Sequence, residues 1–282
     1  MSLYLEPSLR SARISGRVQA WREAGEGPAL PLVLLHGIGS NARAWAGQFA
    51  GFSQERRVVA WNAPGYAGSD PLSNFWPLSS DYADALGALL DHLAIKRCVL
   101  VGQSLGAVMA TAFALAAPER VAAMTLTSPA SGYAVPVGGV LPEGVAKRIA
   151  DIEALGPEGL AVARYSRLLA PGASAQAHAI VRSAMAEVVP QGYAQAVRLL
   201  ASADLPSAVT ALRVPTMTLW GSEDVVTPPA GCARVAAATP GGRFESIEGG
   251  GHAVATERPE AFNQTLRRVL DEADAAEGVA WN

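Results

Sequence analysis

The chain has 282 residues, of which 50% are hydrophobic and 17% are charged, and its formal net charge is −3. Soluble proteins average about 25% charged residues, so this apolar composition excludes a disordered chain, a coiled coil and a polyelectrolyte. The small negative charge, without a clustered basic face, argues against a nucleic-acid partner. A chain of this length forms one large domain or two modest ones.

The longest apolar stretch covers residues 105–117. It is shorter than the about 20 residues that a membrane span needs, and it predicts a buried helix. Residues 1–7 lack a basic segment followed by an apolar one, so no signal peptide is predicted. Cys98 and Cys232 stand alone, without metal-ligand spacing, and are predicted to be buried thiols in a reducing compartment. We therefore expect a cytoplasmic protein without a membrane partner.

Short runs rich in Val and Leu alternate with helical stretches, after an antiparallel hairpin expected over residues 12–24. Continuous apolar runs are typical of strands that are covered on both faces. The alternation predicts an α/β fold with a doubly wound, mostly parallel sheet. The expected strands are 32–35, 58–61, 98–101, 124–127, 216–220 and 243–247, and the expected helices are 41–50, 79–93, 105–117, 229–238 and 259–275.

The alternation stops between residues 132 and 205, where helical periodicity replaces the strand-like runs. We interpret this stretch as a helical insertion between two strands of the sheet. The predicted division is a core formed by residues 1–131 and 206–282 and a helical segment formed by residues 132–205. The segment has expected helices at 145–155, 160–169, 175–188 and 193–201, with prolines near their starts, where a missing N–H costs little, at Pro142, Pro157, Pro171 and Pro190.

The pentapeptide Gly102-Gln103-Ser104-Leu105-Gly106 follows directly on an expected strand and opens the apolar helix. It is a G-x-S-x-G motif in the strand–turn–helix context of a nucleophilic serine. The sharp turn makes the serine Oγ project above the sheet, and the flanking glycines leave room for close backbone approach. Ser104 is therefore the predicted nucleophile.

A serine hydroxyl needs a general base, and the base needs an orienting carboxylate. His252 follows three glycines in a loop after the last expected strand and is the predicted base. Asp224 follows the strand at 216–220, at the edge where catalytic groups gather in open α/β sheets. It is predicted to orient His252, with Glu223 as the alternative. The remaining histidines are interpreted as structural or surface residues: His36, His92 and His178.

A tetrahedral oxyanion needs two backbone N–H donors. One is expected from Leu105, directly after the nucleophile. The other is expected from the loop at residues 36–40, where Ile38 is the predicted donor and His36 is predicted to hold the loop. The sequence predicts no cofactor and no metal ligands.

Together these motifs resemble the α/β-hydrolase superfamily over nearly the whole chain, at residues 34–37, 62–69, 102–106, 221–224 and 251–252. The resemblance implies that the helical segment is a cap, or lid, over a small or medium substrate. Gln103 replaces a histidine of many relatives, and Ala253 replaces an aromatic residue usual in ring-fission carbon–carbon hydrolases. The chain is therefore more similar to the carboxylesterase and enol-lactonase side, as a serine hydrolase that forms an acyl-enzyme with an ester or lactone.

Three other functions stay open on these residues: hydrolysis of a carbon–carbon bond in a ring-fission product, perhydrolysis, and a small-molecule receptor with a slow triad. The substrate pocket is expected between the sheet and the cap. Its expected lining is Trp45, Phe75, Trp76, Tyr133, Tyr165, Leu168, Met185 and Tyr193. Cap arginines are an option for binding a substrate carboxylate: Arg164, Arg182 and Arg198.

Overall fold

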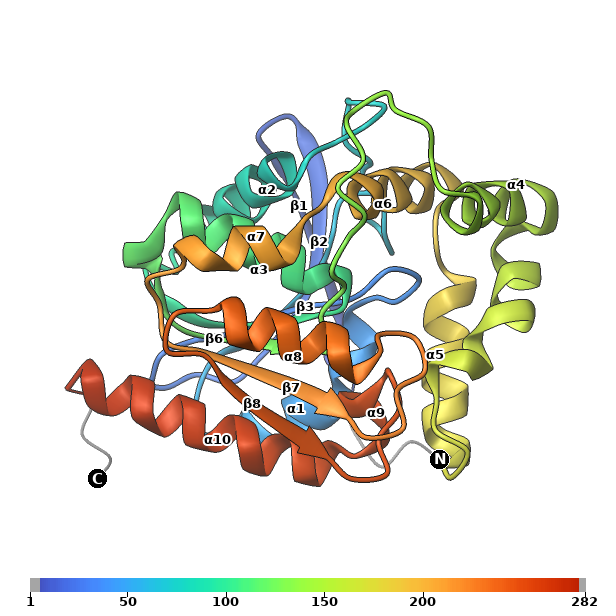
Figure 1. The fold of residues 1–282 in the computed structure, drawn as a ribbon. Coiled ribbons are helices and arrows are strands. Elements are labelled where there is room, and N and C mark those ends of the chain that lie inside the picture. The colour runs from blue at the N-terminus through green and yellow to red at the C-terminus, as the bar shows by residue number, and fades with distance from the viewer. Residues whose placement is uncertain (1–5, 279–282) are drawn as a thin grey trace.

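The computed structural model describes residues 6–278. Eight strands form one sheet: β1 (Leu9–Ile14), β2 (Arg17–Ala24), β3 (Leu32–Leu35), β4 (Val58–Asn62), β5 (Cys98–Gln103), β6 (Val121–Thr127), β7 (Thr216–Gly221) and β8 (Arg243–Ile247). Their order is β1-β2-β4-β3-β5-β6-β7-β8 (Figure 1). β2 pairs antiparallel with β1 and β4, and the remaining pairs are parallel. This confirms the predicted fold class.

The hairpin of β1 and β2 forms one edge of the sheet. Its two-residue turn has a left-handed backbone at both positions, with φ of 48° at Ser15 and 83° at Gly16. Turns of this kind match the right-handed twist of the flanking strands, and glycine adopts the required φ without strain. The hairpin predicted over residues 12–24 is confirmed, and its first strand begins earlier, at Leu9.

Helices connect the strands and cover both faces of the sheet. They are α1 (Ala46–Phe52), α2 (Ser79–His92), α3 (Leu105–Ala116), α4 (Glu143–Arg164), α5 (Ala175–Ala186), α6 (Pro190–Ser202), α7 (Leu205–Ala208), α8 (Pro229–Ala238), α9 (Val254–Glu257) and α10 (Pro259–Ala276), with 3-10 turns η1 (Ala42–Trp45), η2 (Pro118–Arg120), η3 (Tyr165–Leu168) and η4 (Val209–Ala211). None of the helices within residues 6–278 is both long and apolar enough to cross a bilayer.

Alternate residues of a strand serve the two faces. Leu32 and Leu34 of β3 pack in the core under α1 and α10, whereas Val33 and Leu35 pack in the core with α2 and α3. Because both faces are covered, the whole strand is apolar. This is why the apolar run at residues 32–35 predicted the bounds of β3, whereas β8 has the expected bounds although only Ile247 in it is buried.

The connection between β6 and β7 carries α4, α5 and α6, and Figure 1 shows α4 and α5 beyond the tips of β7 and β8. α4 is bent, because Gly156 has φ of 65° within it and Pro157 follows. Its two halves, continued by η3, correspond to the helices expected at 145–155 and 160–169. α5 begins at Ala175, as expected, four positions after Pro171.

The division into a core and a helical segment at residues 132–205 stays a prediction. The two ends of the core, residues 1–5 and 279–282, lie outside the described residues.

Cys98 and Cys232 are buried free thiols. Burial raises the pKa of each thiol to about 12. Neither is therefore a reactive thiolate at neutral pH.

Candidate active site

Ser104 stands on a strained turn between β5 and α3. Its φ of 55° and ψ of −114° are unusual for a residue with a side chain, and such strain costs about 1–3 kcal/mol. The turn is held by the hydrogen bond from Ser104 N–H to the Thr127 carbonyl (2.9 Å). A Cβ on Gly106 would lie 2.3 Å from the Leu35 carbonyl oxygen. The glycine is therefore required for the close backbone approach under the serine.

His252 and Asp224 follow the neighbouring strands β8 and β7. His252 Nδ1 lies 2.9 Å from Asp224 Oδ2, and both residues are buried. The carboxylate fixes the proton on Nδ1, which leaves Nε2 as an acceptor. Ser104 and His252 line the same cavity, although no hydrogen bond among the described residues joins their side chains. Catalytic contacts of this kind are often longer before substrate binds.

Asp224 is held ionised by its surroundings. Burial raises the pKa of its carboxyl, but the hydrogen bond and charge of His252, with hydrogen bonds from Thr227, outweigh burial and lower the pKa to about 2. Asp224 Oδ1 also accepts from the backbone N–H groups of Val226 (2.7 Å) and Thr227 (3.0 Å). A fully bonded carboxylate of this kind can orient an imidazole and stabilise its charged form.

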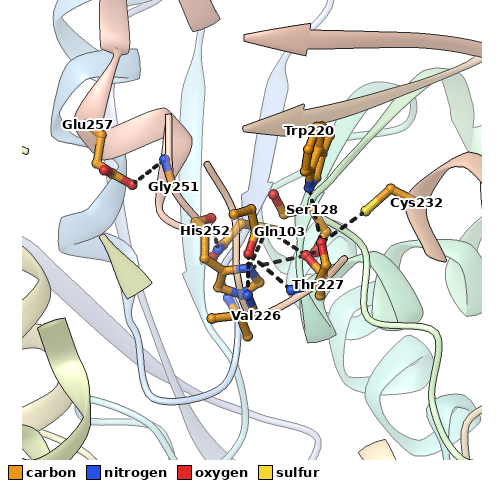
Figure 2. A network of polar contacts seen from close by, with 11 residues as sticks. Gln103, Ser128, Trp220, Val226, Thr227, Cys232, Gly251, His252 and Glu257 are labelled. Carbon is orange, nitrogen blue, oxygen red and sulfur yellow. Dashed lines mark hydrogen bonds and ion pairs between the residues drawn. The ribbon is translucent and has the colours of Figure 1, made fainter. Parts of the chain in front are cut away.

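Thr227 is a site residue that the sequence reasoning missed. Its Oγ1 donates to Asp224 Oδ2 (2.6 Å). The same Oγ1 lies 3.3 Å from His252 Nδ1, and Figure 2 shows Thr227 and His252 side by side. Asp224 accepts from the two amides that follow it, as Asp does in turns. The signal that could have found it is an Asp followed three positions later by Thr, just before two prolines.

The residues predicted to form the oxyanion hole, Ile38 and Leu105, both line the cavity beside Ser104. Leu105 is the first residue of α3, so its N–H has no acceptor within the helix. Ile38 lies in a loop closed by the hydrogen bond from Ser40 N–H to the Gly37 carbonyl (3.2 Å). A Cβ on Gly37 would lie 2.9 Å from Ser104 Cβ. Glycine at this position therefore allows the loop to approach the nucleophile.

His36 holds the same loop from inside the protein. Its Nδ1 donates to the Gly37 carbonyl (2.8 Å), and its Nε2 accepts from Ala63 N–H (3.1 Å). Burial lowers the pKa of His36 to about 4, against a smaller opposing effect of the Gly37 carbonyl. Both ring nitrogens are occupied, which agrees with its predicted structural role.

Gln103 links this loop to the histidine loop. Its Oε1 accepts from Gly37 N–H (3.2 Å), and its Nε2 donates to the His252 carbonyl (3.0 Å; Figure 2). The side chain therefore couples the two loops that flank Ser104. The sequence showed Gln103 as a departure from a histidine in many relatives, but its partners are too distant in sequence to be predicted.

Glu257 links the histidine loop to the end of η3. Its Oε1 accepts from Gly251 N–H (3.1 Å) and its Oε2 from Ala170 N–H (2.7 Å). Beside it, Ala253 N–H donates to the Leu168 carbonyl (2.9 Å). Burial raises the pKa of Glu257, and the two amide hydrogen bonds oppose this. We call residues 168–170, 251–253 and 257 the junction.

A cavity of about 750 Å³ lies over Ser104 and His252. Four of the residues expected in the substrate pocket line it: Tyr133, Leu168, Met185 and Tyr193. Trp45 instead lines a separate cavity of about 20 Å³ beside His252 and packs against Phe262 of α10.

Three more expected pocket residues lie outside the large cavity. Tyr165 packs edge-on against His178, with ring centroids 5.7 Å apart. Phe75 is 73% exposed and lies under the guanidinium of Arg198, and Trp76 packs against the core. Tyr165 begins η3, whose course after the bend of α4 the sequence pattern did not specify.

The three arginines of residues 132–205 that were considered for a substrate carboxylate differ in their positions. Arg164 lines the large cavity, whereas Arg198 is engaged with Phe75 and Arg182 lies exposed on α5 outside the lining. Three basic residues that the sequence reasoning passed over line the cavity with Arg164: Lys147, Arg148 and Arg167.

Other titratable residues considered from the sequence lie away from Ser104. Glu223 is exposed and its N–H donates to the Gly250 carbonyl (2.8 Å). His92 is exposed at the end of α2, where its ring packs on Trp21. Within residues 6–278, no group of three or more His, Cys, Asp or Glu side chains is arranged to hold a metal ion.

Comparison with known proteins adds the family. A profile described as alpha/beta hydrolase fold matches residues 31–259. The 2-hydroxy-6-oxononadienedioate/2-hydroxy-6-oxononatrienedioate hydrolase 2 of Pseudomonas putida is 29% identical over 275 residues, which cover 89% of this chain and 90% of that protein.

Two solved structures show the same fold. A thermophilic esterase from Thermogutta terrifontis, with malate bound, has a TM-score of 0.83 at 25% identity, covering 94% of this chain and 99% of that one. The enol-lactonase from Burkholderia xenovorans LB400 has a TM-score of 0.83 at 24% identity, covering 93% of this chain and 100% of that one.

Proposed function

Because the chain belongs to the α/β hydrolase fold family, we propose that it is a serine hydrolase that cleaves a small or medium carboxylic ester or lactone through an acyl-enzyme. The observation that carries the proposal is the 2.9 Å contact between His252 Nδ1 and ionised Asp224, at the wall of the cavity that holds Ser104 on its strained turn.

In the first step, His252 Nε2 takes the proton of Ser104 as its Oγ attacks the ester carbonyl carbon. Asp224 orients the imidazole and stabilises its positive charge. The backbone N–H groups of Ile38 and Leu105 bind the oxyanion, whose charge develops next to the N-terminus of α3. The tetrahedral intermediate collapses, the bond to the alcohol oxygen breaks, and His252 gives its proton to that oxygen.

In the second step, water attacks the acyl-enzyme. His252 Nε2 accepts one proton of the water while the hydroxide oxygen bonds to the acyl carbon. When the bond to Ser104 Oγ breaks, the same proton returns to the serine and the free acid leaves. No group beyond the triad, the two amides and water is required.

Residues 132–205 form the cap in this proposal. Their helices line the cavity opposite Ser104 through residues such as Tyr193 and Met185. A cap of this size suits small or medium substrates. The buried free thiols Cys98 and Cys232 support a reducing compartment such as the cytoplasm.

The test replaces the nucleophile. We expect Ser104→Ala to lose at least about 10³-fold in kcat on a short-chain 4-nitrophenyl ester, with unchanged circular dichroism, and to lose labelling by a fluorophosphonate. Ser131→Ala removes another serine hydroxyl from the same cavity and is the matched control. Full activity of Ser104→Ala would refute the proposal.

A second candidate is carbon–carbon bond hydrolysis, which the name of the Pseudomonas putida relative supports at 29% identity. Ala253 after His252 and the loop at 36–40 favour the ester or lactone instead. Kinetics with an enol lactone, a simple ester and a dienedioate ring-fission product separate the two. A higher kcat/KM on the ring-fission product than on every ester and lactone would make carbon–carbon bond hydrolysis the better-supported function.

A further inference from the structure

We propose that basic side chains of α4 and η3 form a carboxylate-binding subsite in the catalytic cavity, so that the preferred substrate is an ester or lactone that carries a carboxylate away from the bond that is cleaved. The inference rests on the proposed function and names its substrate class.

The wall of the cavity contributed by α4 and η3 is strongly positive. Lys147, Arg148 and Arg164 of α4 and Arg167 of η3 all line the cavity, and Asp151 is the acidic residue among the lining side chains. Four positive charges therefore face one negative charge. This contrasts with the chain as a whole, whose formal net charge is −3.

The bend of α4 gathers these charges. In a straight helix, residues 151 and 164 would be about 20 Å apart along the axis. Because Gly156 turns the chain, Arg164 reaches back and its guanidinium lies 2.5 Å from Asp151 Oδ2. The same turn brings Arg167, beyond the bend, to the cavity that Arg148 lines from before it.

The single acid does not neutralise the cluster. Asp151 is shared, with Lys147 Nζ at 2.6 Å from Oδ1 and Arg164 on Oδ2. Among residues 6–278, neither Arg148 nor Arg167 forms an ion pair with an acidic side chain. Two guanidinium groups in the wall of the cavity that Ser104 also lines therefore lack an ion-pair partner among the described residues.

Arg148 is partly shielded from solvent. It is half-buried, and its guanidinium lies close enough to the phenol of Tyr193 to interact with it electrostatically; Tyr193 belongs to α6 and is 3% exposed. The paired N–H groups of a guanidinium match the two oxygens of a carboxylate. Tyr193 thus connects the subsite to the apolar part of the cavity.

The test compares charged and neutral esters of matched size. 4-Nitrophenyl hemiglutarate places the carboxylate on the acyl side, with its neutral methyl ester as reference. 4-Acetoxybenzoate places it on the leaving group, with methyl 4-acetoxybenzoate as reference. We expect the wild type to prefer the charged member of at least one pair by about tenfold in kcat/KM, and the favoured pair identifies which half of the substrate meets the subsite.

Arg148→Met and Arg167→Met should each reduce that preference about threefold to tenfold, because kcat/KM falls more on the charged ester than on its neutral reference. Arg182→Met removes a cap arginine that does not line the cavity. It should change neither the preference for the charged ester nor kcat/KM on the neutral ester. As a readout without turnover, Ser104→Ala should bind glutarate in calorimetry, and the double variant with Arg148→Met should bind it more weakly.

Two failures are distinguishable. Equal kcat/KM for charged and neutral esters, together with glutarate binding that Arg148→Met leaves unchanged, would overturn the subsite while the esterase proposal stands. Lack of turnover of every ester by the wild type would instead refute the proposed function, and the glutarate measurement would still test the subsite.

Discussion

The sheet and the junction are held by different kinds of contact. β3 and β5 are buried along their whole length, and their side chains fill two hydrophobic cores. The junction is instead made by three backbone N–H groups, one buried carboxylate and one carbonyl. Apolar burial is spread over many residues, whereas the junction depends on a few directed hydrogen bonds.

The difference predicts which property each region controls. Breaking a contact in the core should lower stability and leave the geometry around Ser104 intact. Breaking the junction should disturb the loop that carries His252 while most of the buried surface remains. Stability and activity should therefore separate between the two regions.

The largest effect is expected in the core, at the ion pair of Arg56 and Asp274. Both side chains are fully buried, with Nη2 and Oδ2 2.9 Å apart, and Asp274 Oδ1 also accepts from Leu30 N–H (3.1 Å). Asp274→Asn removes the carboxylate charge that faces the buried guanidinium. We expect the free energy of unfolding to fall by about 3–5 kcal/mol, measured by urea denaturation, with kcat/KM unchanged wherever the variant is folded.

The control is the double variant Arg56→Met with Asp274→Leu. Replacing both charges by apolar side chains removes the need to bury an uncompensated charge, so it should recover most of the lost stability. A loss of less than about 1 kcal/mol in Asp274→Asn would show that the core does not depend on this pair, and would weaken the contrast with the junction.

The same contrast explains what could be predicted from the sequence. The bounds of β3 follow from a short-range pattern of burial, because all four of its residues are apolar and buried. β6 begins at Val121, before the predicted start. The prediction missed these residues because the alanines that follow Val121 are compatible with strand and helix alike. The order of motifs predicted that Asp224 and His252 would lie together, since neighbouring strands end at one edge.

Contacts between residues far apart in the sequence could not be predicted in this way. Asp274 lies 218 positions from Arg56, and no local pattern marks them as partners. Glu257 and Ala170 are 87 positions apart. The lining of the cavity depends on the bend of α4 at Gly156. A glycine in a helical stretch does not by itself indicate in which direction the helix bends.

The next effect tests the junction through Glu257→Gln. A glutamine has one acceptor oxygen, so one of the two buried N–H groups, of Gly251 or Ala170, faces an NH₂ group instead. We expect stability to fall by about 1–2 kcal/mol and kcat/KM to fall about tenfold, mainly through kcat, because His252 follows Gly251 directly. Steady-state kinetics and urea denaturation of the same preparation provide the comparison.

Glu158→Gln, at an exposed position of α4, is the matched control and should match the wild type in both measurements. If Glu257→Gln lost stability as severely as Asp274→Asn yet kept full kcat, the junction would be a structural contact only. The separation of stability from activity between the two regions would then fail.

The smallest effect is expected from Thr227→Val, which keeps the shape of the side chain and removes its 2.6 Å hydrogen bond to Asp224. Losing this hydrogen bond should cost about 1 kcal/mol and so reduce kcat/KM about fivefold at neutral pH. Thr227→Ser should retain most of the activity.

Thr227→Val should also raise the pKa of Asp224 from about 2. Because that pKa is lower in the folded state than the unfolded value of about 3.9, the stability it contributes is present above pH 4 and lost as the pH falls toward 2. In Thr227→Val the ionised Asp224 should contribute less stability above pH 4, and this smaller contribution should be lost over a narrower pH range. The urea midpoints of the wild type and the variant should therefore converge between pH 4 and pH 2. Midpoints that differ by a constant amount over this range would mean that Thr227 acts by packing and not through the charge of Asp224.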